Sequence, residues 1–228
     1  MHPLAPSQAR LVSAARGWIE FYPPYDREEA FVGLEGFSHV WVIFMFHQSL
    51  GNEVNFTVQP PYKDGERYGL WATRAPNRPN QIGQSLVELE RIEKQKGKVK
   101  LHLKGIDLIE GTPIIDIKPY LPYVDAISDA LGGFAQQAPQ PRLQVVFSAA
   151  ADQQLNAIEN NYPDLRLLIT EVLQLDPCRI YYRQDFEKKR FTLRLYDLAV
   201  HSEVIDEKHV SVLEVAVFSA AQTDTPGH

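Results

Sequence analysis

The stretch KVKLHLK, residues 98–104, alternates apolar with basic side chains and one histidine, without exception. Val99, Leu101 and Leu103 fall on one side of this segment, and its lysines and His102 fall on the other. Because a two-residue side-chain period belongs to a β-strand, the stretch predicts a strand with one buried face and one face in water. TPIIDIKP, residues 112–119, continues the alternation and predicts a further strand.

Strands and turns are predicted for most of the chain before residue 128. GWIEFYP (17–23) and ERYGLWATR (66–74) are candidate strands. SHVWVIFMF (38–46) is almost continuously apolar, which predicts a strand buried on both faces. EEAFVGLEGF (28–37) predicts a short helical turn ended by glycine. No repeat of fixed period is present, so a solenoid is not expected.

The composition changes at SDALGGFAQQAPQPR, residues 128–142, where small, polar and helix-breaking residues predict a linker. Beyond it we expect a small α+β unit with the order β-α-α-β-β-β. Its first helix is predicted over 150–162, and its second opens at Pro163 with Asp164 near the positive end. The predicted strands lie in 142–148, 190–200 and 209–218, and the second helix carries an apolar stripe of Leu165, Leu168, Ile169, Val172 and Leu173.

The bulk composition restricts the class of protein. With 44% hydrophobic residues, the 228-residue chain can bury a substantial core. The run VWVIFMF is too short to cross a bilayer and no leader is evident, so we expect neither a membrane partner nor a signal peptide. A single cysteine, Cys178, excludes an internal disulfide and predicts a cytoplasmic protein. The seven histidines lack metal-ligand spacing, so no metal is expected.

The segment ATRAPNRPNQIGQS, residues 72–85, fixes two arginines beside two prolines. A guanidinium group binds a carboxylate or phosphate through two parallel hydrogen bonds, so Arg74 and Arg78 are candidate ligand-binding residues. The alternative is an ordinary surface ion pair. The net charge of −6 argues mildly against a nucleic-acid partner, although it does not exclude a local basic patch.

Three long blocks occur in one order: GLEGFSHVWVIFMFHQ, ATRAPNRPNQIGQSLVEL and GIDLIEGTPIIDIKPYLPYVD. Together they resemble the TsaA-like (TrmO) family of tRNA methyltransferases, and YPDLRLLITEVLQLDP resembles its C-terminal region. The resemblance implies a mainly β fold with α+β: a single-sheet β-barrel at residues 1–135 that binds S-adenosylmethionine, then a small α+β domain at 136–228. It also implies a homodimer that methylates N6 of threonylcarbamoyladenosine, at position 37 beside the tRNA anticodon.

The resemblance further implies a set of site residues. Cofactor-binding positions are implied at Pro6, Ser7, Gln8, His47, Gln48, Arg74, Gln84, Asp107, Leu108, Ile109, Glu110 and Gly111. Asp116 and Asp107 are alternative general bases, but each is also explained as a structural partner of Lys118 or of loop amides. Basic residues that suit single-stranded RNA, some of them beside Tyr181 and Tyr182, are Arg78, Arg179, Arg183, Lys188, Lys189 and Arg190.

The chain departs from the family pattern in four places. Ser7 replaces an arginine, Gln81 replaces a proline in RPNQIG, an Arg-Pro-Pro-Arg stretch becomes QPPY (59–62), and Cys178 interrupts the motif at 176–179. Because two of these changes remove positive charge, two alternatives stay open beside the methyltransferase. One is a cofactor-binding module without tRNA activity, and the other is a methyltransferase with a different acceptor.

Overall fold

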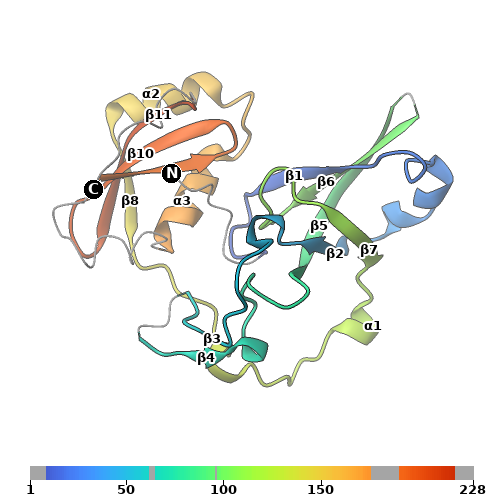
Figure 1. The fold of residues 1–228 in the computed structure, drawn as a ribbon. Coiled ribbons are helices and arrows are strands. Elements are labelled where there is room, and N and C mark those ends of the chain that lie inside the picture. Colours follow the sequence, from blue (N-terminus) through green and yellow to red (C-terminus); the bar gives the residue numbers. More distant parts are fainter. Residues whose placement is uncertain (1–8, 62–64, 96, 176–189, 219–228) are drawn as a thin grey trace. The chain divides into compact units, whose positions relative to one another are not determined.

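The structure, a computed structural model, describes residues 9–61, 65–95, 97–175 and 190–218. The chain divides into two compact units, with the boundary between Ala138 and Pro139 (Figure 1). The boundary falls inside the predicted linker segment. The described residues contain no helix that is long and apolar enough to span a membrane.

The first unit is built on a five-stranded antiparallel sheet with the strand order β1-β6-β5-β2-β7. Its strands are β1 (Arg16–Glu20), β2 (His39–Met45), β5 (Ile82–Gln95), β6 (Lys98–Lys104) and β7 (Ile114–Pro119). A separate two-stranded ribbon pairs β3 (Thr57–Val58) with β4 (Tyr68–Gly69). The recorded pairing leaves β1 and β7 at the sheet ends, so the predicted closed barrel is not confirmed.

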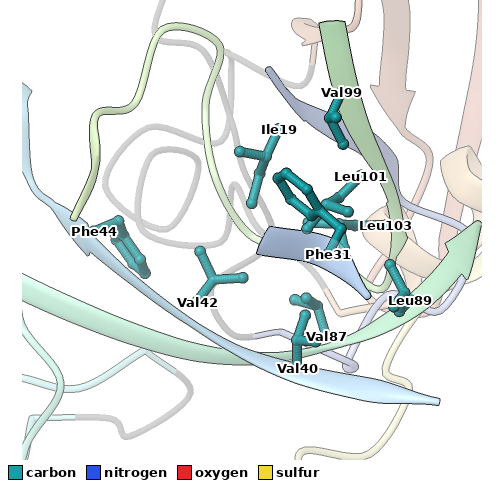
Figure 2. Packing of buried hydrophobic residues seen from close by; sticks show 10 residues of the cluster. All are labelled: Ile19, Phe31, Val40, Val42, Phe44, Val87, Leu89, Val99, Leu101 and Leu103. Atoms are coloured by element: carbon teal, nitrogen blue, oxygen red, sulfur yellow. The ribbon is translucent and has the colours of Figure 1, made fainter. Parts of the chain in front are cut away.

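The core of this unit gathers on one face of the sheet. The predicted alternation in 98–104 is confirmed, since Val99, Leu101 and Leu103 are completely buried. Figure 2 shows them converging with residues of β1, β2 and β5 around the Phe31 ring. Backbone pairing joins the strands into one layer, and burial of this apolar surface, at about 25 cal/mol per Å², stabilises the packing on its inner face.

Three local predictions for this unit need correction. Residues 38–46 form a strand that alternates instead of being buried on both faces: Val40, Val42 and Phe44 are buried and their neighbours are half-buried. Residues 66–74, predicted as one strand, contain only β4 and the 3-10 turn η4 (Leu70–Ala72). In addition, the 14-residue strand β5 was not predicted. The helical turn in 28–37 is two 3-10 turns, η1 (Glu28–Phe31) and η2 (Leu34–Gly36), and the second does end at glycine.

Short turns complete the first unit. They are η3 (His47–Ser49), α1 (Pro122–Asp125) and η5 (Gly133–Ala135). The helix α1 is tied to β2, because the Asp125 carboxylate accepts hydrogen bonds from the Trp41 indole at 3.2 Å and from the Leu121 amide at 2.9 Å. The turn η3 directly follows β2 and therefore emerges at the end of a strand that lies between β5 and β7 in the sheet.

The second unit confirms the predicted order in the described residues. Its elements are β8 (Gln144–Phe147), α2 (Ala149–Ile158), α3 (Leu165–Gln174), β9 (Arg190–Leu195), β10 (Leu198–Val204) and β11 (His209–Val217). The sheet order is β8-β11-β10-β9, with β8 parallel to β11, and both helices pack against this sheet. The predicted stripe on α3 is confirmed, since all five of its residues are buried.

Two details of the second unit differ from the predictions. Pro163 lies before α3 instead of in its first turn, because Asp164 takes a left-handed conformation with φ 63° and interrupts the helix. The segment 190–200 is not one strand. It is a hairpin whose turn contains Tyr196, also in a left-handed conformation with φ 57°.

Gly83 on β5 provides a test of how this sheet packs. It is buried opposite Phe44, and a Cβ at this position would overlap the Phe44 ring and lie 2.9 Å from Cζ of Phe46. We expect Gly83→Ala to destabilise the fold by about 1–3 kcal/mol, since overpacking forces rings out of their rotamers. Chemical denaturation measures this effect. Gly36→Ala, whose Cβ meets nothing within 4 Å, is the matched control. Equal stabilities of the two variants would contradict the packing.

Candidate functional site

The end of β2 is where the predicted site segments meet. The pairing of β2 with β5 runs to Met45 opposite Ile82, and the pairing of β2 with β7 places Phe44 opposite Ile114. The Met45 amide also donates to the Pro113 carbonyl at 3.0 Å. The register therefore brings together η3 after β2, the arginine segment before β5, and the 107–113 loop before β7.

The arginine segment is held in shape mainly by Arg78. Its Nη1 donates to the Thr73 carbonyl at 2.8 Å and reaches the Leu70 and Ala75 carbonyls at 3.5 Å. The guanidinium carbon lies 5.3 Å from the centroid of the Trp71 ring. Arg78 is half-buried, so this arginine organises its own loop, and its predicted contact with RNA stays a prediction.

Arg74 lies between two of the carbonyls that Arg78 binds, and its side chain is exposed. It is close enough to Asp107 to lower the pKa of that carboxyl. The structure thus brings together two of the predicted cofactor residues, which are 33 positions apart (107 − 74) in the sequence.

Asp107 is the electrostatic centre of this group. Its Oδ2 accepts a hydrogen bond from the Ala9 amide at 2.7 Å. Its Oδ1 is buried and has no hydrogen-bond partner with good geometry among the described residues, although the nearby Ser85 hydroxyl helps to lower the pKa. Burial is the largest influence and raises the pKa of Asp107 above its ordinary value, against the opposing effects of Ser85, the Ala9 amide and Arg74. An unpartnered buried carboxylate oxygen favours a cationic or hydrogen-bond-donating ligand.

Asp116 has the opposite environment. Its carboxylate accepts from Lys118 Nζ at 2.6 Å and from the Ile117 amide at 2.8 Å, and the Lys118 hydrogen bond is the main reason that its pKa is lowered. Asp116 pairs with Ile43 on β2, which in turn pairs with Gln84 on β5. Gln84 and Asp116 are exposed and lie on the face of the sheet opposite the buried Ser85. The two candidate bases are therefore in different environments on different faces.

The 107–113 loop forms a tight turn. The Thr112 amide and hydroxyl both donate to the Ile109 carbonyl, at 3.2 and 2.7 Å. Gly111 has φ 78°, a left-handed conformation that favours glycine. Glu110 and Gly111 are exposed, whereas Leu108 is half-buried and packs against the core cluster. The turn therefore offers exposed main-chain groups beside an apolar side chain.

The remaining predicted residues divide into two sets. His47 and Gln48 lie in η3 at the meeting point of the three segments. Arg190 opens β9 and its Nε lies 3.4 Å from Glu203 Oε2. The predicted positions that lie outside the described residues are Pro6, Ser7, Gln8, Arg179, Arg183, Lys188 and Lys189.

Sequence reasoning missed Ser85, Ala9 and the structural role of Gln81. Ser85 had a readable signal, because the alternation through Gly83, Val87 and Leu89 places it on the buried face of β5. Ala9 had none, since its contact with Asp107 spans 98 residues. Within the described residues, no group of three His, Cys, Asp or Glu side chains is arranged to hold a metal. A hollow of about 570 Å³ lined by Glu35, Phe37 and residues 89–92 and 94 contains none of the predicted site residues.

The raised pKa of Asp107 has a measurable consequence. The folded chain binds this proton more tightly than the unfolded chain, so stability is greatest below the ordinary value of 3.8 and falls as pH rises through the folded pKa. Asp107→Asn does not titrate. We therefore expect the free energy of unfolding of the variant, relative to the native chain, to increase as the pH is raised from about 4 to 7.

The matched control for this titration is Asp116→Asn. Because the pKa of Asp116 is lowered, its carboxylate contributes stability above 3.8 that is lost as pH falls through the folded pKa. The free energy of unfolding that this variant loses relative to the native chain should therefore become smaller in acid. Denaturant midpoints across the pH range decide both cases. A pH-independent difference for Asp107→Asn would show that the carboxyl is solvated in the folded chain.

Comparisons with known proteins cover both units. Residues 2–126 match the tRNA-methyltransferase O N-terminal domain, and residues 140–217 match the TrmO C-terminal domain. The tRNA (adenine(37)-N6)-methyltransferase of Escherichia coli K12 is 42% identical over 88% of this chain and 86% of its own. RcsF of Pseudomonas aeruginosa PAO1, provisionally named an S-adenosylmethionine-dependent methyltransferase, is 44% identical over 92% of this chain and 90% of its own. The crystal structure of TrmO from Pseudomonas aeruginosa superposes with a TM-score of 0.73 at 38% identity, covering 95% of this chain and 98% of that one. A site assembled around Arg74 and Asp107 thus sits in a chain whose matches extend through both units, and the chain belongs to the tRNA-methyltransferase O family.

Proposed function

We propose that this protein is an S-adenosylmethionine-dependent methyltransferase that modifies N6 of adenosine 37 in tRNA. The observation that carries the proposal is the buried Oδ1 of Asp107, which has no hydrogen-bond partner of good geometry in the part of the chain that the structure describes, beside the exposed Arg74. Relatives that match 88% and 79% of this chain carry this activity in their names. The same matches disfavour the two alternatives, a module without tRNA activity and a methyltransferase with another acceptor.

The side chains fit the charges of this cofactor. The methionine part of S-adenosylmethionine carries an ammonium and a carboxylate on one carbon atom. Asp107 would hold the ammonium with its free oxygen, and Arg74 would hold the carboxylate. The exposed main chain of Glu110 and Gly111 suits hydrogen bonds to the adenine edge, with Leu108 contributing apolar contact.

The bound cofactor supplies an electrophilic methyl group on sulfur. Transfer would form a bond from this carbon to N6 and break its bond to sulfur, and the N6 proton would pass to water. We assign Asp107 to holding the cofactor. Asp116 is already paired with Lys118 and its lowered pKa makes it a weak base, so we assign no protein base. The contribution of the chain is then to hold donor and acceptor in line, which removes most of the entropic barrier.

The finer features of the proposal rest on the family resemblance. They are threonylcarbamoyladenosine as the acceptor, a closed barrel in the first unit, a homodimer, a cytoplasmic location, and RNA contact by the second unit. Arg190 is the described residue of the predicted RNA-binding loop, and its side chain is 76% exposed. An exposed positive charge of this kind attracts RNA phosphate but does not select a nucleotide sequence.

Arg74 provides a direct test of cofactor binding. We expect Arg74→Ala to weaken S-adenosylmethionine binding at least about tenfold, because a charge-assisted bidentate contact is lost. Isothermal titration calorimetry measures the affinity. Arg27→Ala is the control, since Arg27 is a surface arginine whose Nη1 lies 3.8 Å from Glu29 Oε1, on a different segment. Unchanged affinity in Arg74→Ala would remove this residue from the site.

The reaction is tested with labelled S-adenosylmethionine and two tRNA preparations, one with and one without the threonylcarbamoyl group. We expect label in adenosine 37 of the modified tRNA, identified after nuclease digestion. Label in the unmodified tRNA would show a different acceptor. Donor binding without transfer would support the binding module, and no donor binding would overturn the proposal.

A further inference from the structure

Gln81 connects two parts of the site that the sequence alone leaves separate. Its side-chain Nε2 donates to the Ser49 carbonyl at 2.6 Å, across 32 positions of sequence. Its backbone carbonyl accepts from the Phe46 amide at 2.8 Å, and its amide donates to the Arg78 carbonyl at 3.2 Å. One residue therefore binds the strand end that precedes η3, the last residue of η3, and the arginine segment.

Gln81 has a backbone conformation that glycine would adopt more easily, so its side chain must contribute to the structure. Its φ of 51° lies in the left-handed region, where a residue with a Cβ costs roughly 1–2 kcal/mol and glycine costs little. Proline, whose ring locks φ near −65° and which has no amide hydrogen, would fit neither this conformation nor the bond to Arg78. The left-handed backbone conformation is unfavourable for glutamine. The compensating contribution of its side chain is the hydrogen bond from Nε2 to the Ser49 carbonyl.

The bonds of Gln81 continue through Arg78 to Arg74. Arg78 binds the carbonyls of Thr73 and Ala75, the residues on either side of Arg74. A continuous series of hydrogen bonds thus runs from Ser49 through Gln81 and Arg78 to the backbone that carries Arg74. Its two ends are the turn with His47 and Gln48 and the proposed carboxylate-binding guanidinium.

We propose that Gln81 is a positioning residue, which fixes the His47–Ser49 turn relative to Arg74 and so pre-organises the cofactor site. The inference rests on the proposed function for its ligand, S-adenosylmethionine. Without the side chain, the backbone pairing of β2 with β5 persists. The Ser49 carbonyl also keeps its bond from the Asn52 amide at 3.1 Å. We call the hydrogen bond from Gln81 Nε2 to the Ser49 carbonyl the clamp. Its loss therefore loosens the turn without leaving a buried carbonyl unpaired, and cofactor binding is weakened more than folding.

The test compares Gln81→Gly with Gln81→Glu. Glycine keeps the left-handed backbone and removes the clamp, while glutamate keeps the length but replaces the donor with an oxygen that repels the Ser49 carbonyl. For both we expect faster amide hydrogen exchange in residues 47–50 without ligand, and about a fivefold loss of S-adenosylmethionine affinity by calorimetry. Gln81→Gly should keep the melting temperature of the native chain although it binds the cofactor more weakly. If Gln81 had only a structural role, weaker binding would be accompanied by a lower melting temperature.

Arg67→Ala is the matched control, because Arg67 Nη2 also clamps a backbone carbonyl, that of Thr57 at 2.7 Å, in the ribbon of β3 and β4. It should alter neither exchange in 47–50 nor affinity. Unchanged exchange in both Gln81 variants would overturn the clamp, and faster exchange with native affinity would overturn its positioning role. If the native chain binds no cofactor, the proposed function fails and the positioning role fails with it. The exchange data then still report whether the clamp exists.

Discussion

The antiparallel pairing of β2 with both β5 and β7 determines where the site lies. Each of these strand pairs ends or begins at a loop that carries predicted cofactor residues, and the pairs meet at Phe44 and Met45. Gly83 is what permits this geometry, because the Phe44 and Phe46 rings, 5.1 Å apart in an edge-to-face contact, occupy the space of its missing side chain. The apolar core and the polar site are thus adjoining parts of one packing arrangement.

The two-residue period of the strands then sorts the polar groups. On β5, Ser85 points into the core side near Asp107, whereas Gln84 next to it is exposed on the other face. On β7, Asp116 shares the outer face with Lys118 and pairs with it. The hydrogen bond from Lys118 lowers the pKa of Asp116 on the outer face, and burial raises the pKa of Asp107 at the core edge. The same residue type therefore has its pKa shifted in opposite directions, on a strand for Asp116 and in the loop before β7 for Asp107.

The spacing of apolar residues predicted the elements that bury one complete face. The strand at 98–104 and the stripe on α3 are confirmed because each buries one complete face. The strand β5 was missed because its buried positions include Gly83 and Ser85, which do not read as apolar. The segment 66–74 was wrong as a long strand because Gly69 and the turn η4 end the pairing after two residues. For the site, family motifs named Arg74 and Asp107 separately. Their proximity follows from strand register, and the Ala9 amide that binds Asp107 is 98 residues away in the sequence, so no local pattern encodes this arrangement.

The proposed assignment of Asp107 to the cofactor ammonium would connect cofactor binding with folding. A partly desolvated carboxylate, one of whose oxygens has no partner among the described residues, destabilises the folded chain at neutral pH, and Arg74, which is exposed and screened by water, compensates for only part of this. A ligand ammonium at Oδ1 would remove the penalty and lower the pKa of Asp107 again. Part of the binding free energy then arises from relieving a cost that the folded chain already carries.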